Sequence, residues 1–428
     1  MWKALRNAFK IPELRDRIIF TILALIVFRL GIYIPIPGIN LGEWANLFRR
    51  FSEGAAGGLV SFFDIFAGGA LRRYSIFAMS VTPYINASII LQLLTSVMPK
   101  LKEMLREGEE GRKKFAAYTR RLTVVLGGAQ ACLLSIGISR NPNLIVVNPW
   151  MFVVVSTASM LAGTMFLLWL GERITEKGIG NGISIIIFAG IVARYPQYFG
   201  QAVVGNLNLL GWLFLIGIFV VMVLAIVYVQ QGERRITIQY ARRISGRRVY
   251  GGASTYVPIR VNQGGVIPII FAMAIMMIPS MLATLTGSPT IQRLFGGGSP
   301  LYVSMYAVLV FFFTYFYSSV VFDPFDVADN IKSYGGFIPG IRPGRPTAEY
   351  FMKVLNRVTF MGAIFLVAIA LLPNVVQAVI KLTNIYIGGT SALIAVGVAL
   401  DVLQQMEAHL IMRHYEGFIK KGRLRGRR

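Results

Sequence analysis

The topology of this chain depends on residues 183–204, whose sequence is ISIIIFAGIVARYPQYFGQAVV. A helix needs about 20 mostly apolar residues to cross a bilayer. This stretch is long enough, but Arg194 and Pro196 interrupt it. Whether it crosses fixes the number of membrane spans, and therefore the side of the membrane on which every later segment lies.

The composition around this stretch is that of a polytopic membrane protein. Of the 428 residues, 55% are hydrophobic and only 14% are charged, whereas about a quarter of the residues of a soluble protein are charged. The apolar runs predict ten membrane spans, at residues 18–36, 74–98, 122–138, 150–170, 183–204, 209–229, 265–285, 301–322, 358–380 and 385–403.

The positive charges favour keeping residues 183–204 as the fifth span. With ten spans and a cytoplasmic N-terminus, 34 of the 43 Lys and Arg residues lie in cytoplasmic segments and six lie on the outer side. Without the fifth span, 19 positive charges in the last three basic segments would lie outside. Because cytoplasmic loops carry the excess of Lys and Arg, we expect ten spans with both termini in the cytoplasm.

An odd number of spans in each half implies an inverted arrangement. If the chain divides into residues 1–204 and residues 205–428, each part has five spans, and the second part enters the membrane from the opposite side. Many transporters are built in this way, with the working site between the halves. The fold class expected is therefore all-α and polytopic, with ten transmembrane helices in two inverted five-helix halves.

Several segments are not spans. Residues 54–73 are glycine-rich and partly apolar, which fits either a short helix that re-enters the bundle or a helix on the outer surface. The cytoplasmic segments 231–264 and 323–356 are rich in Arg, Gly and Pro, and loops of that length are usually functional. We expect them to be docking sites for a cytoplasmic partner, and the basic tail 406–428 to stay in the cytoplasm.

The residues needed for enzymatic or metal chemistry are missing from the sequence. It has no Gly-x-x-x-x-Gly-Lys motif, and His409 and His414 are five residues apart, a spacing that does not put both on one helical face. The glycines of GIGNG, residues 178–182, are better explained as a turn before a span than as a phosphate-binding loop. We expect neither an enzyme nor a cofactor or metal site.

Charged residues inside the spans are also few. Arg29 lies near the outer end of the first span, where it can reach the interface or pair with a carboxylate such as Asp64. Asp401 lies near the cytoplasmic end of the tenth span. A secondary transporter of small solutes remains the alternative function, but it lacks the mid-membrane charges that an ion relay needs. A passive conduit driven by an external partner fits better.

Eight runs of residues, in order, resemble the bacterial members of the SecY/Sec61 family of protein-conducting channels. They are PIPGI (35–39), GGALRR (68–73), PYINASIILQLL (83–94), GERITEKGIGNGISIIIFAGIVA (171–193), ERRITIQYARR (233–243), VNQGGVIPIIFA (261–272), GGFIPGIRPG (335–344) and GGTSALI (388–394). The resemblance covers nearly the whole chain. It implies a channel that passes unfolded polypeptide outward and releases apolar segments sideways into lipid.

The resemblance also implies roles for particular residues. Segment 54–73 is expected to be a plug that closes the outer funnel, with Phe62, Phe63, Ile65, Phe66, Gly68, Gly69 and Ala70 as its packing residues. A constriction between the halves is expected to be lined by Val81, Ile85, Ile187, Ile270 and Ile394. A lateral gate, where spans two and three face seven and eight, is expected to include Asn86, Gln130 and Ile278.

The two cytoplasmic segments are implied to bind the motor ATPase SecA and the ribosome, through Arg242, Arg243, Arg247, Arg248, Arg342 and Arg345. Arginine suits contacts with ribosomal RNA phosphates or an acidic protein surface. Arg342 is the first choice, because the prolines and glycines around it fix the shape of its loop. The other partners implied are the small membrane subunits SecE and SecG, the unfolded preprotein with its signal sequence, and the lipid of the bacterial cytoplasmic membrane.

Overall fold

The computed structural model describes residues 11–53, 64–204, 209–240, 243–245, 248–250, 254–273, 275–276, 299–380 and 389–421. The chain forms two compact units. The first comprises Met1–Gly200 and Val398–Arg428, and the second comprises Gln201–Gly397. The first break falls close to the boundary expected at 204/205, whereas the C-terminal segment groups with the first unit. The division of the working protein into inverted halves stays a prediction.

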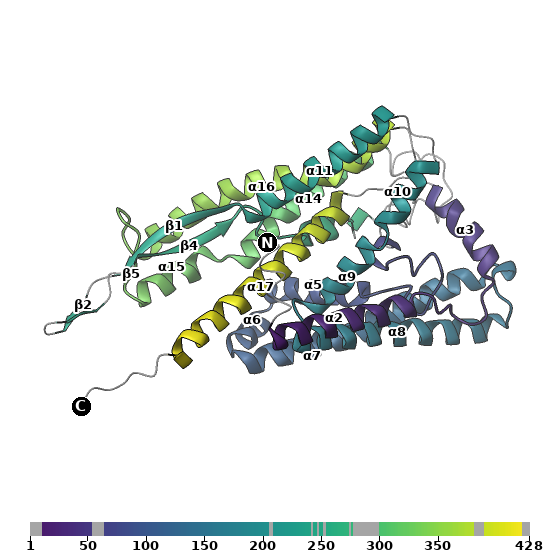
Figure 1. Ribbon diagram of the computed structural model, residues 1–428, viewed down its shortest axis with the longest axis horizontal. Helices are drawn as coiled ribbons and strands as arrows, with labels where there is room; N and C mark the ends of the chain where they lie inside the picture. Colours follow the sequence, from purple (N-terminus) through teal and green to yellow (C-terminus); the bar gives the residue numbers. More distant parts are fainter. Residues whose placement is uncertain are drawn as a thin grey trace. The chain divides into compact units, whose positions relative to one another are not determined.

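The first unit is built from helices that pack against α7 and α8, which run side by side (Figure 1). Both α5 and α6 contact α7, and α2 and α9 contact α8. Its elements are α2 (Pro12–Gly31), α3 (Leu41–Glu53), α5 (Thr82–Val97), α6 (Pro99–Arg106), α7 (Glu109–Ser139), η1 (Pro142–Leu144), α8 (Pro149–Lys177), α9 (Gly182–Val192), α10 (Tyr195–Val204) and the later turns of α17 (Gly389–Lys421).

Short polar side chains set where the helices of this unit begin. The Asn148 side chain accepts a hydrogen bond from the backbone N–H of Trp150, and Pro149 occupies the first turn of α8. Asn181 caps α9 in the same way, accepting from the N–H groups of Ile183 and Ser184 at 3.1 and 3.3 Å. Both are preferred N-cap arrangements. The GIGNG segment is therefore the turn between two helices that the sequence predicts.

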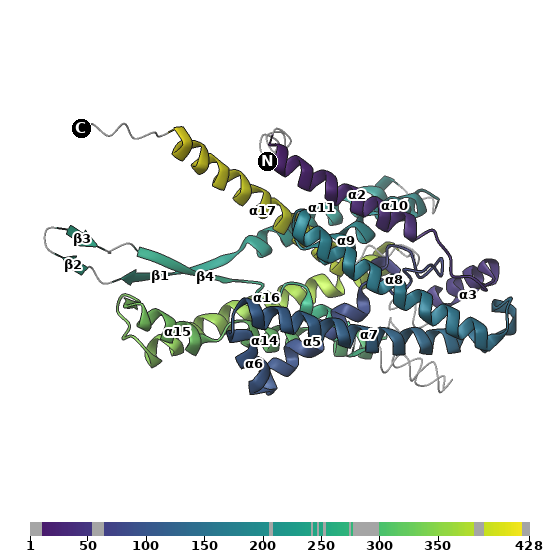
Figure 2. The same ribbon diagram turned by 90° about the horizontal axis from the view of Figure 1, so that it is seen from below.

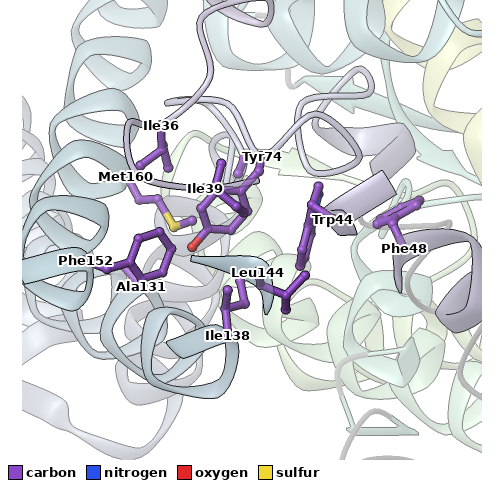
Figure 3. Close-up of a cluster of buried hydrophobic side chains, with 11 residues drawn as sticks. Ile36, Ile39, Trp44, Phe48, Tyr74, Ala131, Ile138, Leu144, Phe152 and Met160 are labelled. Carbon is purple, nitrogen blue, oxygen red and sulfur yellow. The ribbon is translucent and has the colours of Figure 1, made fainter. Parts of the chain in front are cut away.

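An aromatic core lies where the loops at one end of α7 and α8 meet α3 (Figure 3). Tyr74 stands at its centre, fully buried, with its ring centroid 5.0 Å from that of Trp44 and 6.1 Å from that of Phe152. The indole N–H of Trp44 donates a hydrogen bond to the carbonyl of Leu71 at 3.2 Å. The amphipathic helix α3 is thus fixed to the loop that leads into α5.

The second unit combines three long apolar helices with a small sheet. It contains α11 (Leu209–Gln231), α14 (Pro300–Val321), α15 (Pro324–Ser333), α16 (Arg345–Ile380) and the start of α17. Both α11 and α14 pack against α16. The strands are β1 (Glu233–Tyr240), β2 (Arg243–Ser245), β3 (Arg248–Tyr250), β4 (Ser254–Arg260) and β5 (Gly336–Phe337).

The sheet has the order β4-β1-β5, with β1 antiparallel to both neighbours. Ile236 and Ile238 of β1 lie two residues apart and so share one face. They are buried with Phe351 and Leu355 of α16. The pair β2–β3 forms a separate hairpin beyond the end of β1 and β4 (Figure 2). The predicted cytoplasmic segment 231–264 is therefore a β-structured arm within an otherwise helical fold.

Six helices in the described part of the chain are long and apolar enough to cross a membrane. They are Glu109–Ser139, Pro149–Lys177, Gly211–Gln231, Pro300–Ser333, Arg345–Pro373 and Gly389–Leu410. Many of their apolar side chains are exposed, such as Leu213, Val221 and Leu224 of α11, each more than 60% exposed. Exposed apolar surface on this scale fits lipid. A polytopic helical membrane protein is confirmed, whereas the count of ten spans stays a prediction.

The predicted second and fifth spans differ in detail from the observed helices. The second was expected from residue 74, but α5 begins at Thr82, because Pro83 fits only the first turn of a helix. Tyr74 and Ser80, with φ of 46° and 51°, bend the chain before it. The fifth is two helices, α9 and α10, separated at Ala193 and Arg194, with Pro196 in the first turn of α10.

Candidate functional site

Residues 64–73, here called the inner segment, pass through the first unit, and all but the last three residues are buried. Every residue from 64 to 70 is buried, including the predicted plug residues Ile65, Phe66, Gly68, Gly69 and Ala70. The other two predicted plug residues, Phe62 and Phe63, lie outside the described residues. A surface helix would leave one face in solvent or headgroups, so this burial agrees with a segment enclosed by protein.

Two glycines allow the inner segment to approach α9 closely. Gly68 and Gly69 have φ of 64° and 92°, in the left-handed region that favours glycine. A Cβ at Gly68 would lie 3.0 Å from the Cα of Gly190 in α9. The two backbones therefore touch at a pair of glycines, and no larger residue fits between them without a shift.

A buried ion pair joins the inner segment to the end of α9. The Asp64 carboxylate pairs with the Arg194 guanidinium. Asp64 is fully buried and Arg194 is 8% exposed. Asp64 also accepts a hydrogen bond from the backbone N–H of Arg72 at 2.8 Å, and Arg194 donates one to the Gln197 side chain at 3.1 Å. The arginine that interrupts the fifth predicted span is thus a partner of the inner segment.

Pairing with Asp64, one of the two placements considered for Arg29, is not what the structure has. Arg29 does not take the Asp64 carboxylate, which Arg194 holds. Instead its guanidinium donates a hydrogen bond to the carbonyl of Gly68 at 3.1 Å and lies 5.5 Å from the ring centroid of Tyr33. The reason is that the break between α9 and α10 brings Arg194 to the carboxylate, and the sequence alone does not show which basic residue is nearer.

Hydroxyl groups hold the turn that follows the inner segment. The Tyr74 hydroxyl and the Ser156 hydroxyl of α8 are hydrogen-bonded at 2.8 Å, and Ser135 of α7 donates to Ser156 at 2.9 Å. Ser80 donates to the carbonyl of Phe66 at 3.3 Å. These bonds connect the inner segment and its exit turn to the two longest helices of the unit.

The predicted constriction residues are divided between the units. Val81 caps the start of α5, Ile85 lies in its first turns and Ile187 lies in α9, all in the first unit. Ile270, and Ile394 of α17, belong to the second unit. Val81, Ile187 and Ile394 are buried, and Ile85 and Ile270 are half-buried. That these side chains form one ring stays a prediction.

The predicted gate residues are described only in part. Asn86 lies on α5 and Gln130 on α7, two helices in contact, and both side chains are half-buried. Ile278 lies outside the described residues. The lateral gate therefore stays a prediction.

The predicted docking arginines lie on two features of the second unit. Arg243 is in β2, and Arg248 in β3 pairs with Ser245. Arg242 and Arg247 lie outside the described residues. Arg342 lies on the loop between β5 and α16 and Arg345 is the first residue of α16, and both are exposed. Arg345 also contacts Glu349 one turn along α16, at 3.5 Å.

The loop that carries Arg342 is rigid for identifiable reasons. Ile338 before it is buried against the sheet, and Thr347 after it is buried and donates its hydroxyl hydrogen bond to the carbonyl of Arg342 at 2.8 Å. Gly340 and Gly344, with φ of 81° and 99°, form the bends. An exposed guanidinium is thus presented from a loop that is anchored on both sides.

A different arginine on the sheet, Arg235 of β1, already has partners within the chain. A hydrogen bond of 2.6 Å to the Glu233 carboxylate raises the pKa of Arg235 above its ordinary value, and its guanidinium lies 4.8 Å from the ring centroid of Tyr256. Arg235 is therefore less available for an external partner than Arg342.

Sequence reasoning missed a polar hollow of about 250 Å³ in the first unit. The start of α9 and one face of α17 line it, with the side chains of Asn181, Ser184, Val398, Asp401, Val402, Gln404, Gln405 and Ala408. Of these residues, the sequence analysis singled out only Asp401, near the cytoplasmic end of the tenth predicted span, and Asn181, as part of the GIGNG turn.

The sequence matches the family model SecY over residues 75–403. It is 68% identical over 432 residues to a protein translocase subunit SecY of Thermotoga maritima, with 100% of each chain covered. The fold is similar to that of a SecY channel whose plug domain is described as stabilising the closed state and maintaining a membrane seal, with a TM-score of 0.59 at 16% identity. It is also similar to Sec61 in the canine ribosome-channel complex from the endoplasmic reticulum, with a TM-score of 0.60 at 16% identity. Each of these two comparisons covers 92% of both chains.

Proposed function

The chain belongs to the SecY family, and we propose that it is the channel subunit of a protein translocase, through which unfolded polypeptides cross the membrane. The observation that carries this is the match to a translocase subunit over the full length of both chains at 68% identity. A channel subunit of this kind is a transport protein and not an enzyme. A secondary transporter of small solutes is not favoured.

The experiment that tests this function is reconstitution of the purified chain, with its copurifying subunits, in lipid vesicles. Transport of an unfolded preprotein that needs a nucleotide-driven motor is the expected result. Solute uptake driven by a proton or sodium gradient, with the chain alone and without a motor, would instead establish the alternative.

The aliphatic residues Val81, Ile85, Ile187, Ile270 and Ile394 are proposed as the constriction that excludes water from the resting channel. Branched aliphatic side chains offer a passing peptide no specific hydrogen bonds, and a narrow apolar neck stays dry. Replacing Ile85, Ile187 and Ile270 together with Asn removes apolar surface worth about 2 kcal/mol at each position. Single-channel current without substrate or motor should rise. A triple variant as ion-tight as the parent would mean that these residues only pack.

The inner segment is proposed to be the plug, and Asn86, Gln130 and Ile278 to belong to the lateral gate. Burial of residues 64–70 by their own unit supports the first assignment. For the gate, a cysteine pair from Asn86→Cys and Ile278→Cys in a Cys132→Ser background should block transport when oxidised and restore it when reduced. Unchanged transport by the oxidised pair would place the exit elsewhere.

The partners proposed are SecE, SecG, the motor SecA and the ribosome, in the cytoplasmic membrane of a bacterium with both termini in the cytoplasm. The exposed Arg342 and Arg345, together with the arginines of the β2–β3 hairpin, supply positive charge of the kind that an acidic protein surface or RNA phosphates would bind. Further partners are the signal sequence of the preprotein and membrane lipid.

A further inference from the structure

We infer that the buried Asp64–Arg194 ion pair is a charge lock that holds the inner segment in its closed position, with Arg194 as the positioning residue. The inference rests on the proposed function of the inner segment as the plug. It adds the residue that holds the segment, and that residue lies on a different part of the chain, at the break between α9 and α10.

The burial of both charges shows why the pair acts as a lock. Asp64 is fully buried and Arg194 is 8% exposed, so each ion has lost most of its hydration. A buried pair adds little net stability over apolar packing of the same volume, whereas removing one partner leaves an uncompensated charge that is strongly destabilising. The pair therefore determines where the segment lies. The position in which the two charges meet is favoured over buried positions in which they are apart.

The surrounding contacts belong to the same closed position. The backbones of Gly68 and Gly190 touch, Arg29 donates to the carbonyl of Gly68, and the N–H of Gly69 donates to the carbonyl of Asp64 at 2.8 Å. These contacts are neutral or half-exposed. The ion pair is the contact whose loss leaves a penalty, and that penalty applies only while the segment stays buried.

A single substitution should therefore shift the population toward the released state. With Arg194→Gln, the Asp64 carboxylate is unpaired in the closed state but regains water when the segment leaves, so release relieves the penalty. With Asp64→Asn and Arg194→Gln together, no unpaired charge remains, and the closed state should recover. A residue that only fills space would behave differently, because removing the second side chain would loosen the packing further.

The experiment measures exposure of the inner segment in the chain with its copurifying subunits, held in nanodiscs so that both faces are accessible. Ala67, which is 1% exposed, is replaced by Cys in a Cys132→Ser background and labelled with a polar maleimide. Arg194→Gln should raise the labelling rate by about a hundredfold or more, as expected for an uncompensated buried charge. The labelling rate of the double variant should stay within about tenfold of the parent's. The control variant Arg140→Gln, at an exposed site, should be labelled at the parent's rate.

Each outcome decides the inference. A labelling rate for Arg194→Gln equal to the parent's, or a double variant labelled as fast as Arg194→Gln, overturns the lock. Should Arg194→Gln fail to accumulate, Asp64→Asn tests the pair from its other side. If neither single variant accumulates while the double does, the pair serves folding and the lock is also overturned. Preprotein transport by the parent is measured separately, so its absence would reject the proposed function and leave the labelling result standing.

Discussion

Arg194 in the first unit and Arg342 in the second are the same side chain in opposite environments. Arg194 is 8% exposed and its charge is taken up by Asp64, so it fixes one part of the chain against another. Arg342 is exposed on a loop whose ends are anchored by Ile338 and Thr347. A buried, paired arginine therefore fixes two parts of the chain to each other, whereas an exposed arginine on an anchored loop is available to a partner.

The two arginines should differ most in how much each contributes to the free energy of unfolding. Arg194→Gln leaves the Asp64 carboxylate buried without its partner, which costs about 3–5 kcal/mol. Arg342→Gln, at an exposed site, should change the free energy of unfolding by less than about 0.5 kcal/mol. Thermal unfolding of the two purified variants in detergent gives the comparison. Equal stability of both variants would contradict it.

The second prediction concerns preprotein transport, which should depend directly on the exposed Arg342. Arg342→Glu should abolish motor-driven preprotein transport while leaving the chain folded and inserted, since a reversed charged contact costs about 2–5 kcal/mol. Its matched control is Arg140→Glu, which reverses an exposed arginine outside the proposed docking residues and should leave transport unchanged. Normal transport by reconstituted Arg342→Glu would sink the proposed docking contact.

A smaller effect concerns the backbone beside the ion pair. Gly68→Ala places a side chain at φ of 64° and a Cβ 3.0 Å from the Cα of Gly190, a strain of about 1–3 kcal/mol. We expect a lower unfolding temperature and a leak of ions at rest, read by planar-bilayer current. Gly340→Ala, at φ of 81° with open space around it, should share the backbone strain but cause no leak.

The smallest effect tests the anchor under Arg342. Thr347→Val keeps the shape of the buried side chain but removes its hydrogen bond to the Arg342 carbonyl, at a cost of about 1 kcal/mol. Transport should slow by a few fold without being lost. A rate as low as that of Arg342→Glu would mean that loop shape matters more than the charge.

Much of the fold could be predicted because its signals are local. Apolar length and the excess of cytoplasmic arginine indicate the helices, and Pro and Asn mark their starts, as at Asn148 and Asn181. The start of α5 at Thr82 was missed, because residues 74–81 are as apolar as a span and only their left-handed bends exclude a helix. The left-handed backbone angles of Tyr74 and Ser80 cannot be predicted from the composition of this stretch.

The contacts of the inner segment could not be predicted, because they join residues far apart in the sequence. Arg29 lies near the outer end of the first predicted span and Arg194 in the middle of the fifth, and nothing local ranks one above the other as the partner of Asp64. The choice is made by the break before α10, which brings Arg194 to the carboxylate. The exposed loop of Arg342 was predictable, since its prolines and glycines are neighbours in the chain.

The ion pair also constrains how this sequence can drift. A change at Asp64 alone, or at Arg194 alone, passes through a chain with an uncompensated buried charge, whereas a change at both positions does not. We therefore expect selection to act on the two positions together. In an alignment of relatives we expect them to vary together, with the acid and the base present in the same sequences and both replaced in the rest.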